Sequence, residues 1–158
     1  MHDMTAADRM RGAGLFLILL LLTTGVFAQS GQISRVTDPG VRNRMSAMNT
    51  NNAALTVLGD MMGGRAVFDR DRARDARRTL IATTRRIPAL FRKAHADTLS
   101  NARPDIWSNW GDFKGRSKSA QKAARGLDIH SLPRLRKTLP RLVHACLACH
   151  RAYRKDMR

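Results

Sequence analysis

The sequence predicts an all-α fold, and two observations lead to this class. Apolar residues recur at intervals of three, four and seven along most of the chain, which is the spacing of one helix face. Aromatic residues make up only 5% of the composition, and runs of alternating β-branched residues are scarce. At 158 residues, a single domain with one core is expected.

The chain is strongly basic, with 29 Lys and Arg against 12 Asp and Glu and a formal net charge of +17. An apolar content of 43% is that of a folded globular chain, so disorder throughout is excluded. The 2 cysteines are too few for a disulfide-rich scaffold or a four-cysteine metal site. We interpret the charge as a solvated surface that attracts acidic partners.

Residues 1–28 have the pattern of a secretory signal peptide. Arg9 and Arg11 precede an apolar run over residues 12–26, and small residues follow at its end. The run is shorter than the roughly 20 apolar residues that span a bilayer, so an uncleaved anchor is the weaker interpretation. We therefore predict a mature domain over residues 29–158 in the periplasm, with no membrane span after cleavage and no nucleic-acid partner.

Four helices are expected in this mature region, and their short connections favour an antiparallel four-helix bundle. Asp38-Pro39-Gly40 can open the first helix, and Gly63-Gly64 can end it. The third helix is expected to pause near Gly111. The predicted helices cover residues 41–62, residues 69–94, residues 104–126, and the segment from Ser131 to the C-terminus.

Each predicted helix has an apolar stripe for the core, and Pro88 and Pro140 are expected to bend the helices that contain them. The residues predicted to face the core are Val41, Met45, Met48, Leu55, Leu58 and Met62; Ala76, Leu80, Ile81, Ile87, Leu90 and Phe91; Trp107, Trp110 and Phe113; and Leu132, Leu135, Leu139, Leu142 and Val143.

The segment Cys146-Leu147-Ala148-Cys149-His150 is the most informative one in the chain. Its Cys-x-x-Cys-His spacing is that of c-type haem attachment. The thiols and the imidazole stand at i, i+3 and i+4, so on a helix all three leave from one face. Two thioether bonds to one haem c and one iron ligand, His150, can therefore come from a single helical turn.

Three other interpretations of the two cysteines fit less well. A thioredoxin-like redox pair needs a βαβ context, and the predicted elements are helices. A structural zinc needs two more ligands, but His95, His130 and His144 are scattered along the sequence. A disulfide within one helical turn is strained and leaves His150 without a role.

The motif at the end of the predicted fourth helix is longer than the haem signature, and reads Cys146-x-x-Cys149-His150-x-x-Tyr153-Arg154. Together with residues 102–108 followed by Phe113, and with residues 44–48 of the first helix, it resembles the cytochrome c prime family, the class II cytochromes c. The resemblance spans about residues 41–154. It implies a four-helix bundle, commonly a homodimer, that carries haem c on its last helix and covers the other haem face with its first.

The resemblance also implies roles for four further residues. Met48 matches the position over the distal haem face, where a methionine ligates iron in low-spin relatives and only shields it in five-coordinate relatives that admit nitric oxide or carbon monoxide. A third interpretation makes Met48 core filler away from the haem. Arg44 resembles a residue beside a haem propionate, with a solvated helix face as the alternative. Arg154 resembles a residue beside the imidazole, and Tyr153 is expected to pack against the ring.

We predict that the protein is an exported electron carrier. In this prediction His150 and Met48 ligate the haem iron, and redox partner proteins with acidic surfaces dock on the basic surface. The alternative function is the binding of nitric oxide or carbon monoxide by five-coordinate haem, with Met48 as a gate. An enzyme activity is not expected, because no paired carboxylates and no Ser/His/Asp set accompany the motif.

Overall fold

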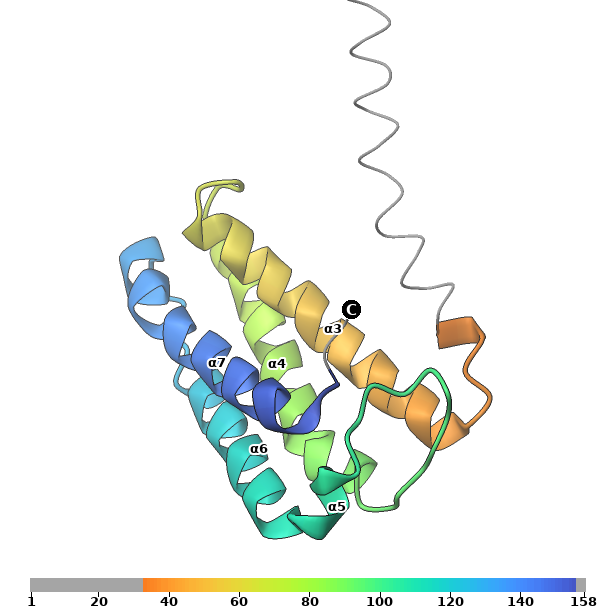
Figure 1. Ribbon diagram of the computed structural model, residues 1–158. Helices are drawn as coiled ribbons and strands as arrows, with labels where there is room; N and C mark the ends of the chain where they lie inside the picture. The colour runs from red at the N-terminus through yellow and green to blue at the C-terminus, as the bar shows by residue number, and fades with distance from the viewer. Residues whose placement is uncertain (1–32, 156–158) are drawn as a thin grey trace, which may run out of the picture. The chain divides into compact units, whose positions relative to one another are not determined.

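The structure is a computed structural model that describes residues 33–155. The predicted signal peptide lies outside the described residues. Residues 33–37 belong to a separate unit, in which residues 33–34 are helical. From residue 38 onward the chain forms a helical bundle (Figure 1). Its helices are α3 (Pro39–Met62), α4 (Arg70–Leu90), the short α5 (Asp105–Ser108), α6 (Trp110–Arg125) and α7 (Leu132–Tyr153).

The four long helices run antiparallel to their sequence neighbours, as Figure 1 shows. Helix α3 packs on α4, α4 on α6, and α6 on α7, while α7 returns to α3 and closes the ring. The seam between α3 and α7 is the least closely packed of the four. The predicted antiparallel four-helix bundle is confirmed.

Local sequence explains where the first two long helices begin and where the first one ends. One Asp38 carboxylate oxygen accepts a hydrogen bond from the Val41 amide at 2.8 Å, which satisfies a free donor of the first turn of α3. The Asp69 carboxylate accepts from two amides of the first turn of α4 at 2.9 Å each. Gly64, just past α3, has φ of 76°, a conformation that glycine adopts without steric cost.

Three predicted boundaries are wrong by a few residues. Helix α4 ends at Leu90, with Phe91 as its C-cap, rather than at residue 94. The break in the third helical segment falls at Asn109 rather than at Gly111, which lies inside the first turn of α6. Asn109 has φ of −112° and ψ of 41°, and asparagine favours helix ends because its side chain competes with the helical backbone. The last helix ends at Tyr153, because Arg154 takes an extended backbone and pairs with Ala102.

Buried residues of the bundle form two clusters. The first cluster joins α3, α4 and α7 with the end of α6, and the second cluster lies around the end of α4 and the start of α6. The first cluster contains Ala54, Leu58, Met61, Ala73, Ala76, Leu80, Ala124, Leu127, Ile129, Leu135, Leu139 and Leu142. The second cluster contains Ile87, Phe91, Ile106, Phe113 and Tyr153.

The predicted apolar stripes are confirmed in outline and wrong at their margins. Val143 was expected in the core but is 37% exposed, because α7 turns the stripe of Leu135, Leu139 and Leu142 inward. Several other predicted core residues are only partly buried: Met45, Met48, Leu55, Met62, Ile81, Leu90, Trp107, Trp110 and Leu132. The bends expected at Pro88 and Pro140 stay predictions; both prolines lie within continuous helices.

Each long helix receives an arginine from a neighbouring helix. In three of the helices the accepting carbonyls lie at the last residue or just beyond it, where positive charge is favourable because carbonyl oxygens at a helix C-terminus lack helical partners and carry partial negative charge. We call these four residues the cross-helix arginines. They are Arg44 of α3, which reaches Leu90; Arg77 of α4, which reaches Arg125 and Leu127; Arg116 of α6, which reaches Ala148; and Arg136 of α7, which reaches Met62.

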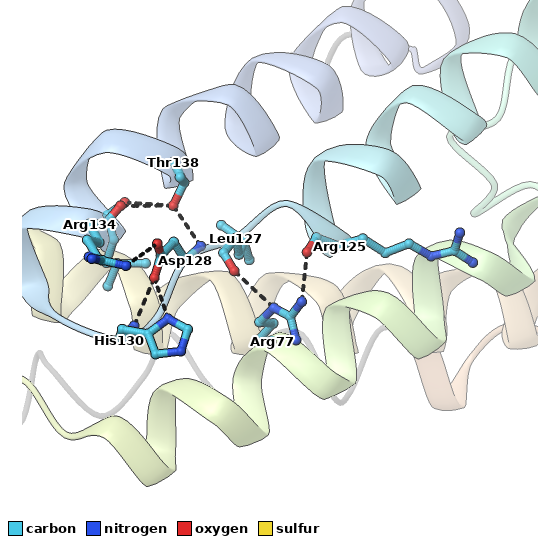
Figure 2. A network of polar contacts seen from close by, with 8 residues as sticks. Arg77, Arg125, Leu127, Asp128, His130, Arg134 and Thr138 are labelled. Carbon is cyan, nitrogen blue, oxygen red and sulfur yellow. Dashed lines mark hydrogen bonds and ion pairs between the residues drawn. The ribbon is translucent and has the colours of Figure 1, made fainter.

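Asp128 organises the turn between α6 and α7, as Figure 2 shows beside the Arg77 contacts. Its carboxylate accepts from the His130 amide at 3.1 Å, lies 2.7 Å from the His130 ring Nδ1, and accepts from Arg134 at 3.3 Å. Its own amide donates to the Thr138 hydroxyl at 3.0 Å. Hydrogen bonding to the His130 side chain, then to the His130 amide, holds the pKa of Asp128 below its ordinary value of 3.8.

Replacing Asp128 by asparagine should make the bundle less stable at neutral pH and reduce its sensitivity to acid. A carboxyl whose pKa is lower in the folded state stabilises that state above its unfolded pKa. This contribution disappears as the pH falls through the folded pKa, so wild type and Asp128→Asn should differ at neutral pH and converge in acid below that pKa. Urea unfolding at neutral pH and in acid tests this expectation. A constant difference across the range would contradict it.

A second prediction compares two glycines of α3. A Cβ atom at Gly40 would lie 2.4 Å from the His95 ring, whereas one at Gly59 would meet nothing within 4 Å. Gly40→Ala should push His95 away from Asp38, with which it pairs at 3.1 Å. Gly59→Ala should stabilise the helix by about 1 kcal/mol. Urea unfolding should therefore separate the variants by about 2 kcal/mol, with Gly40→Ala the less stable.

Candidate functional site

The last turns of α7 carry the two cysteines and the histidine of the motif. Burial of Leu135, Leu139 and Leu142 fixes which side of this helix faces the bundle. Cys146, Cys149 and His150 are all partly buried at its other end. The helical spacing predicted for the motif is therefore confirmed by the structure.

The two cysteines pack against different parts of the core. Cys146 contacts the first cluster and Cys149 the second. Both are free thiols. Burial raises the pKa of Cys146, and it raises the pKa of Cys149 to about 11, against the opposing charge of Arg116. Both thiols are therefore protonated at neutral pH.

His150 offers a neutral imidazole. Burial lowers the pKa of His150, and the positive charge of Arg154 lowers it further. A neutral imidazole is the form that ligates a metal. Within residues 33–155, no three His, Cys, Asp or Glu side chains converge as a metal-ion site, so the zinc interpretation has no donor set there.

Met48 lies on α3, across the loosely packed seam from α7. Its side chain is partly buried and packs against the second cluster, as Cys149 does. The structure thus brings the residue predicted over the distal haem face and one cysteine of the motif to the same cluster. Ligation of iron by Met48 and shielding of iron by Met48 both stay predictions.

Arg44 is buried, with 3% of its surface exposed, so the alternative that it lies on a solvated helix face is wrong. Its guanidinium donates to the Leu90 carbonyl at 3.0 Å, to the His95 carbonyl at 3.1 Å and to the Lys93 carbonyl. It also lies 4.8 Å from the Phe91 ring centroid. These bonds use three of the five N–H donors of the guanidinium. The predicted contact of Arg44 with a haem propionate stays a prediction.

Tyr153 and Arg154 follow the motif at the end of α7. Tyr153 is buried at 6% exposure, and its ring meets Phe113 edge-on at 5.4 Å between centroids. Its hydroxyl donates to the Asp112 carboxylate at 2.6 Å. Arg154 is the C-cap of α7 and lies near enough to His150 to affect its pKa. Contacts of either residue with a bound haem stay predictions.

Sequence reasoning missed three residues of α6 beside the motif. Asp112 and Arg116 form an ion pair at 2.6 Å that contacts α7, and their i, i+4 spacing was the only local signal. Ser117 is 2% exposed, and its hydroxyl is the only buried side-chain polar atom without a hydrogen-bond partner among residues 33–155. Other helical hydroxyls, such as that of Thr84, donate to a carbonyl of their own helix.

The residues present fit a covalently bound haem. Two thiols and a neutral imidazole leave one helical face without converging on a single point, which suits a large ring better than a lone ion. Val143 and Leu147 of the same helix stay 37% and 49% exposed, and the orphaned Ser117 hydroxyl lies on the buried face of α6. A four-helix bundle whose last helix carries a Cys-x-x-Cys-His turn defines a c-type haem protein.

The chain belongs to the cytochrome c' family, because the family model for cytochrome c' matches residues 40–154. Members of this family bind haem c, and the chain has the two cysteines needed for covalent attachment. A curated cytochrome c' from Alcaligenes xylosoxydans xylosoxydans is 37% identical over 59 residues. That alignment covers 35% of this chain and 46% of the relative.

Solved structures of cytochrome c' share the fold. A nitric oxide complex of a variant from Alcaligenes xylosoxidans is 26% identical, with a TM-score of 0.68 over 75% of this chain and 94% of the other. A carbon monoxide-bound variant from the same organism is also 26% identical, with a TM-score of 0.68 over 76% and 98%. Cytochrome c' from Thermochromatium tepidum, 17% identical, has a TM-score of 0.67 over 74% and 95%, which supports the fold alone.

The helices of residues 33–155 lack the features of a membrane span. None of them combines the length and the apolar character that crossing a bilayer requires.

Replacing Arg44 should destabilise the bundle, because a buried guanidinium is removed and three partly buried carbonyl groups lose their donor. Arg44→Met should lower the free energy of unfolding by about 3 kcal/mol, and Arg44→Lys by about half as much. Arg78→Met is the control: its ion pair with Asp75 is exposed at 69% and 66%, so its loss should cost at most about 1 kcal/mol. Urea unfolding measures all three, and equal losses for Arg44→Met and Arg78→Met would contradict the structural role of Arg44.

Proposed function

We propose that this protein is an exported haem c protein whose iron binds a small diatomic gas, nitric oxide or carbon monoxide. The observation that carries the proposal is the match to solved cytochrome c' structures that hold these gases, at TM-scores of 0.68. The loosely packed seam between α3 and α7 supports it, since Met48 and the motif of α7 lie on the two sides of that seam. Binding, with no catalytic step, is the proposed activity.

Residues of α7 would hold the cofactor, and a residue of α3 would cover it. Cys146 and Cys149 would form the two thioethers, and the neutral imidazole of His150 would ligate the iron. When bound, haem supplies an iron that takes up a diatomic gas or exchanges one electron. Met48 would exclude water and larger molecules from the opposite face through its apolar, flexible side chain.

Electron transfer is the second candidate, and the placement of Met48 is the observation that favours it. Met48 packs against the same cluster as Cys149, which supports a role for its thioether as a second protein ligand of the iron. A His/Met ligand pair raises the reduction potential. In that case Met48 would bind the iron and leave no open position for a gas.

Location and partners belong to the same proposal. The signal-peptide pattern of residues 1–28 supports export to the periplasm. The net charge of +17 supports redox or regulatory partners with acidic surfaces. The family resemblance supports a homodimer.

The spectrum of the ferrous, exported protein separates the two candidate functions. We expect a high-spin, five-coordinate spectrum and binding of carbon monoxide. Met48→Ala should leave the spin state unchanged and speed carbon monoxide association by about tenfold, the effect of a barrier about 1.4 kcal/mol lower. Met62→Ala is the control, because Met62 is also a partly buried methionine of α3 but packs against the first cluster.

Two outcomes would reject gas binding. One is a low-spin spectrum with a sulfur-to-iron band that disappears in Met48→Ala, which would establish the electron carrier instead. The other is an exported protein with no added haem mass, which would reject both functions.

A further inference from the structure

One carboxylate oxygen of α6 ties together two side chains beside the haem motif. The Oδ2 atom of Asp112 accepts from Arg116 Nε at 2.6 Å and from the Tyr153 hydroxyl at 2.6 Å. Arg116 lies on α6 with Asp112, whereas Tyr153 is the last residue of α7. The shared oxygen therefore joins the two helices at the end where the motif lies.

Arg116 makes a second connection between the same helices. Its Nη1 atom donates to the Ala148 carbonyl of α7 at 3.2 Å. Ala148 and Tyr153 stand on either side of Cys149 and His150 in the sequence. The Asp112–Arg116 pair thus holds α7 immediately before and shortly after the cysteine and histidine that would attach haem.

The position of this contact sets Arg116 apart from the other cross-helix arginines. Arg44, Arg77 and Arg136 reach carbonyls at the last residue of a helix or just beyond it. Arg116 instead reaches a carbonyl within α7, next to Cys149. Capping of a helix end does not explain this placement, since Ala148 lies more than one turn before the end of α7.

Asp112 and Arg116 are both charged at neutral pH. The hydrogen bond from Arg116, followed by that from Tyr153, holds the pKa of Asp112 below its ordinary value of 3.8. The same pairing raises the pKa of Arg116. The Asp112–Arg116 pair is therefore ionic. Charge-assisted hydrogen bonds of this kind are shorter and stronger than neutral ones.

We propose that Asp112 and Arg116 are positioning residues that fix the orientation of the His150 turn of α7 relative to α6. The proposal rests on the proposed function in taking His150 as the iron ligand. The pair does not touch the iron; it acts through Ala148 and Tyr153, and thereby limits how far the imidazole can tilt. Such outer contacts orient the ligands of many metal sites.

The test compares Asp112→Asn with Asp75→Asn in the exported, haem-loaded protein. Asp75 pairs with Arg78 on α4 alone, which makes it a matched control for the loss of an aspartate–arginine pair. Resonance Raman of the ferrous protein reports the iron–histidine stretch, which a loss of stability alone does not move. We expect this band to shift and broaden in Asp112→Asn and to keep its wild-type position in Asp75→Asn.

Two further variants separate the contact of Asp112 with Tyr153 from the contacts of Arg116. Tyr153→Phe keeps the ring packed and removes only the hydroxyl, so it should shift the band less than Asp112→Asn does. Arg116→Lys keeps the charge, but a single ammonium group cannot donate to Asp112 and Ala148 in the geometry of the planar guanidinium. It should therefore shift the band as Asp112→Asn does. An unchanged band in both Asp112→Asn and Arg116→Lys, with haem attached, overturns the proposal.

Amide hydrogen exchange gives a readout that is independent of haem. The amides of residues 150–153 should exchange about tenfold faster in Asp112→Asn than in Asp75→Asn, because local opening of this turn becomes easier. Equal exchange in the two variants overturns the proposal even if gas binding is intact. If the wild type carries no haem, the proposed function fails, and the exchange contrast still decides whether the pair fixes the turn.

Discussion

Donation from an arginine of one helix to carbonyl oxygens near the end of the next is the interaction on which this bundle depends. The cross-helix arginines run from α3 to α4, from α4 to α6, from α6 to α7, and from α7 back to α3. Arginine suits this use because a long apolar stem carries a planar fork of donors across the gap between helices. Part of the large basic excess therefore has a structural cause in the joining of helices.

The two halves of α7 are held to the bundle by different kinds of contact. Its first half is held by apolar burial of Leu135, Leu139 and Leu142, and its second half by polar contacts with α6 and by the Tyr153 ring. Polar contacts are directional, so they fix the rotation and tilt of the turn as well as its distance from the bundle. A cofactor held at three points of one turn, as proposed here for haem, would require that kind of constraint.

Sequence patterns were sufficient for the four-helix bundle and for the helical spacing of the motif at residues 146–150. The caps at Asp38 and Asp69 and the glycine stop after α3 are local chemistry, which a sequence displays directly. The burial of Arg44 could not be predicted, because its carbonyl partners lie 46, 49 and 51 residues away and are placed only by the end of α4 and the folded loop after it. Asp112 was missed for the same reason, since its role depends on where α7 ends.

The loop from residue 91 to residue 104 contacts both helices of the candidate site, α3 and α7. Figure 1 shows this loop beside the start of α3. Its carbonyls accept from Arg44 of α3, the Asp97 carboxylate accepts from the Asp38 amide, and its last residues pair with the backbone after α7. Loops usually gain and lose residues freely during evolution. Here an insertion would disturb the ends of α3 and α7 at once, and a protease cut in this loop would loosen both helices together.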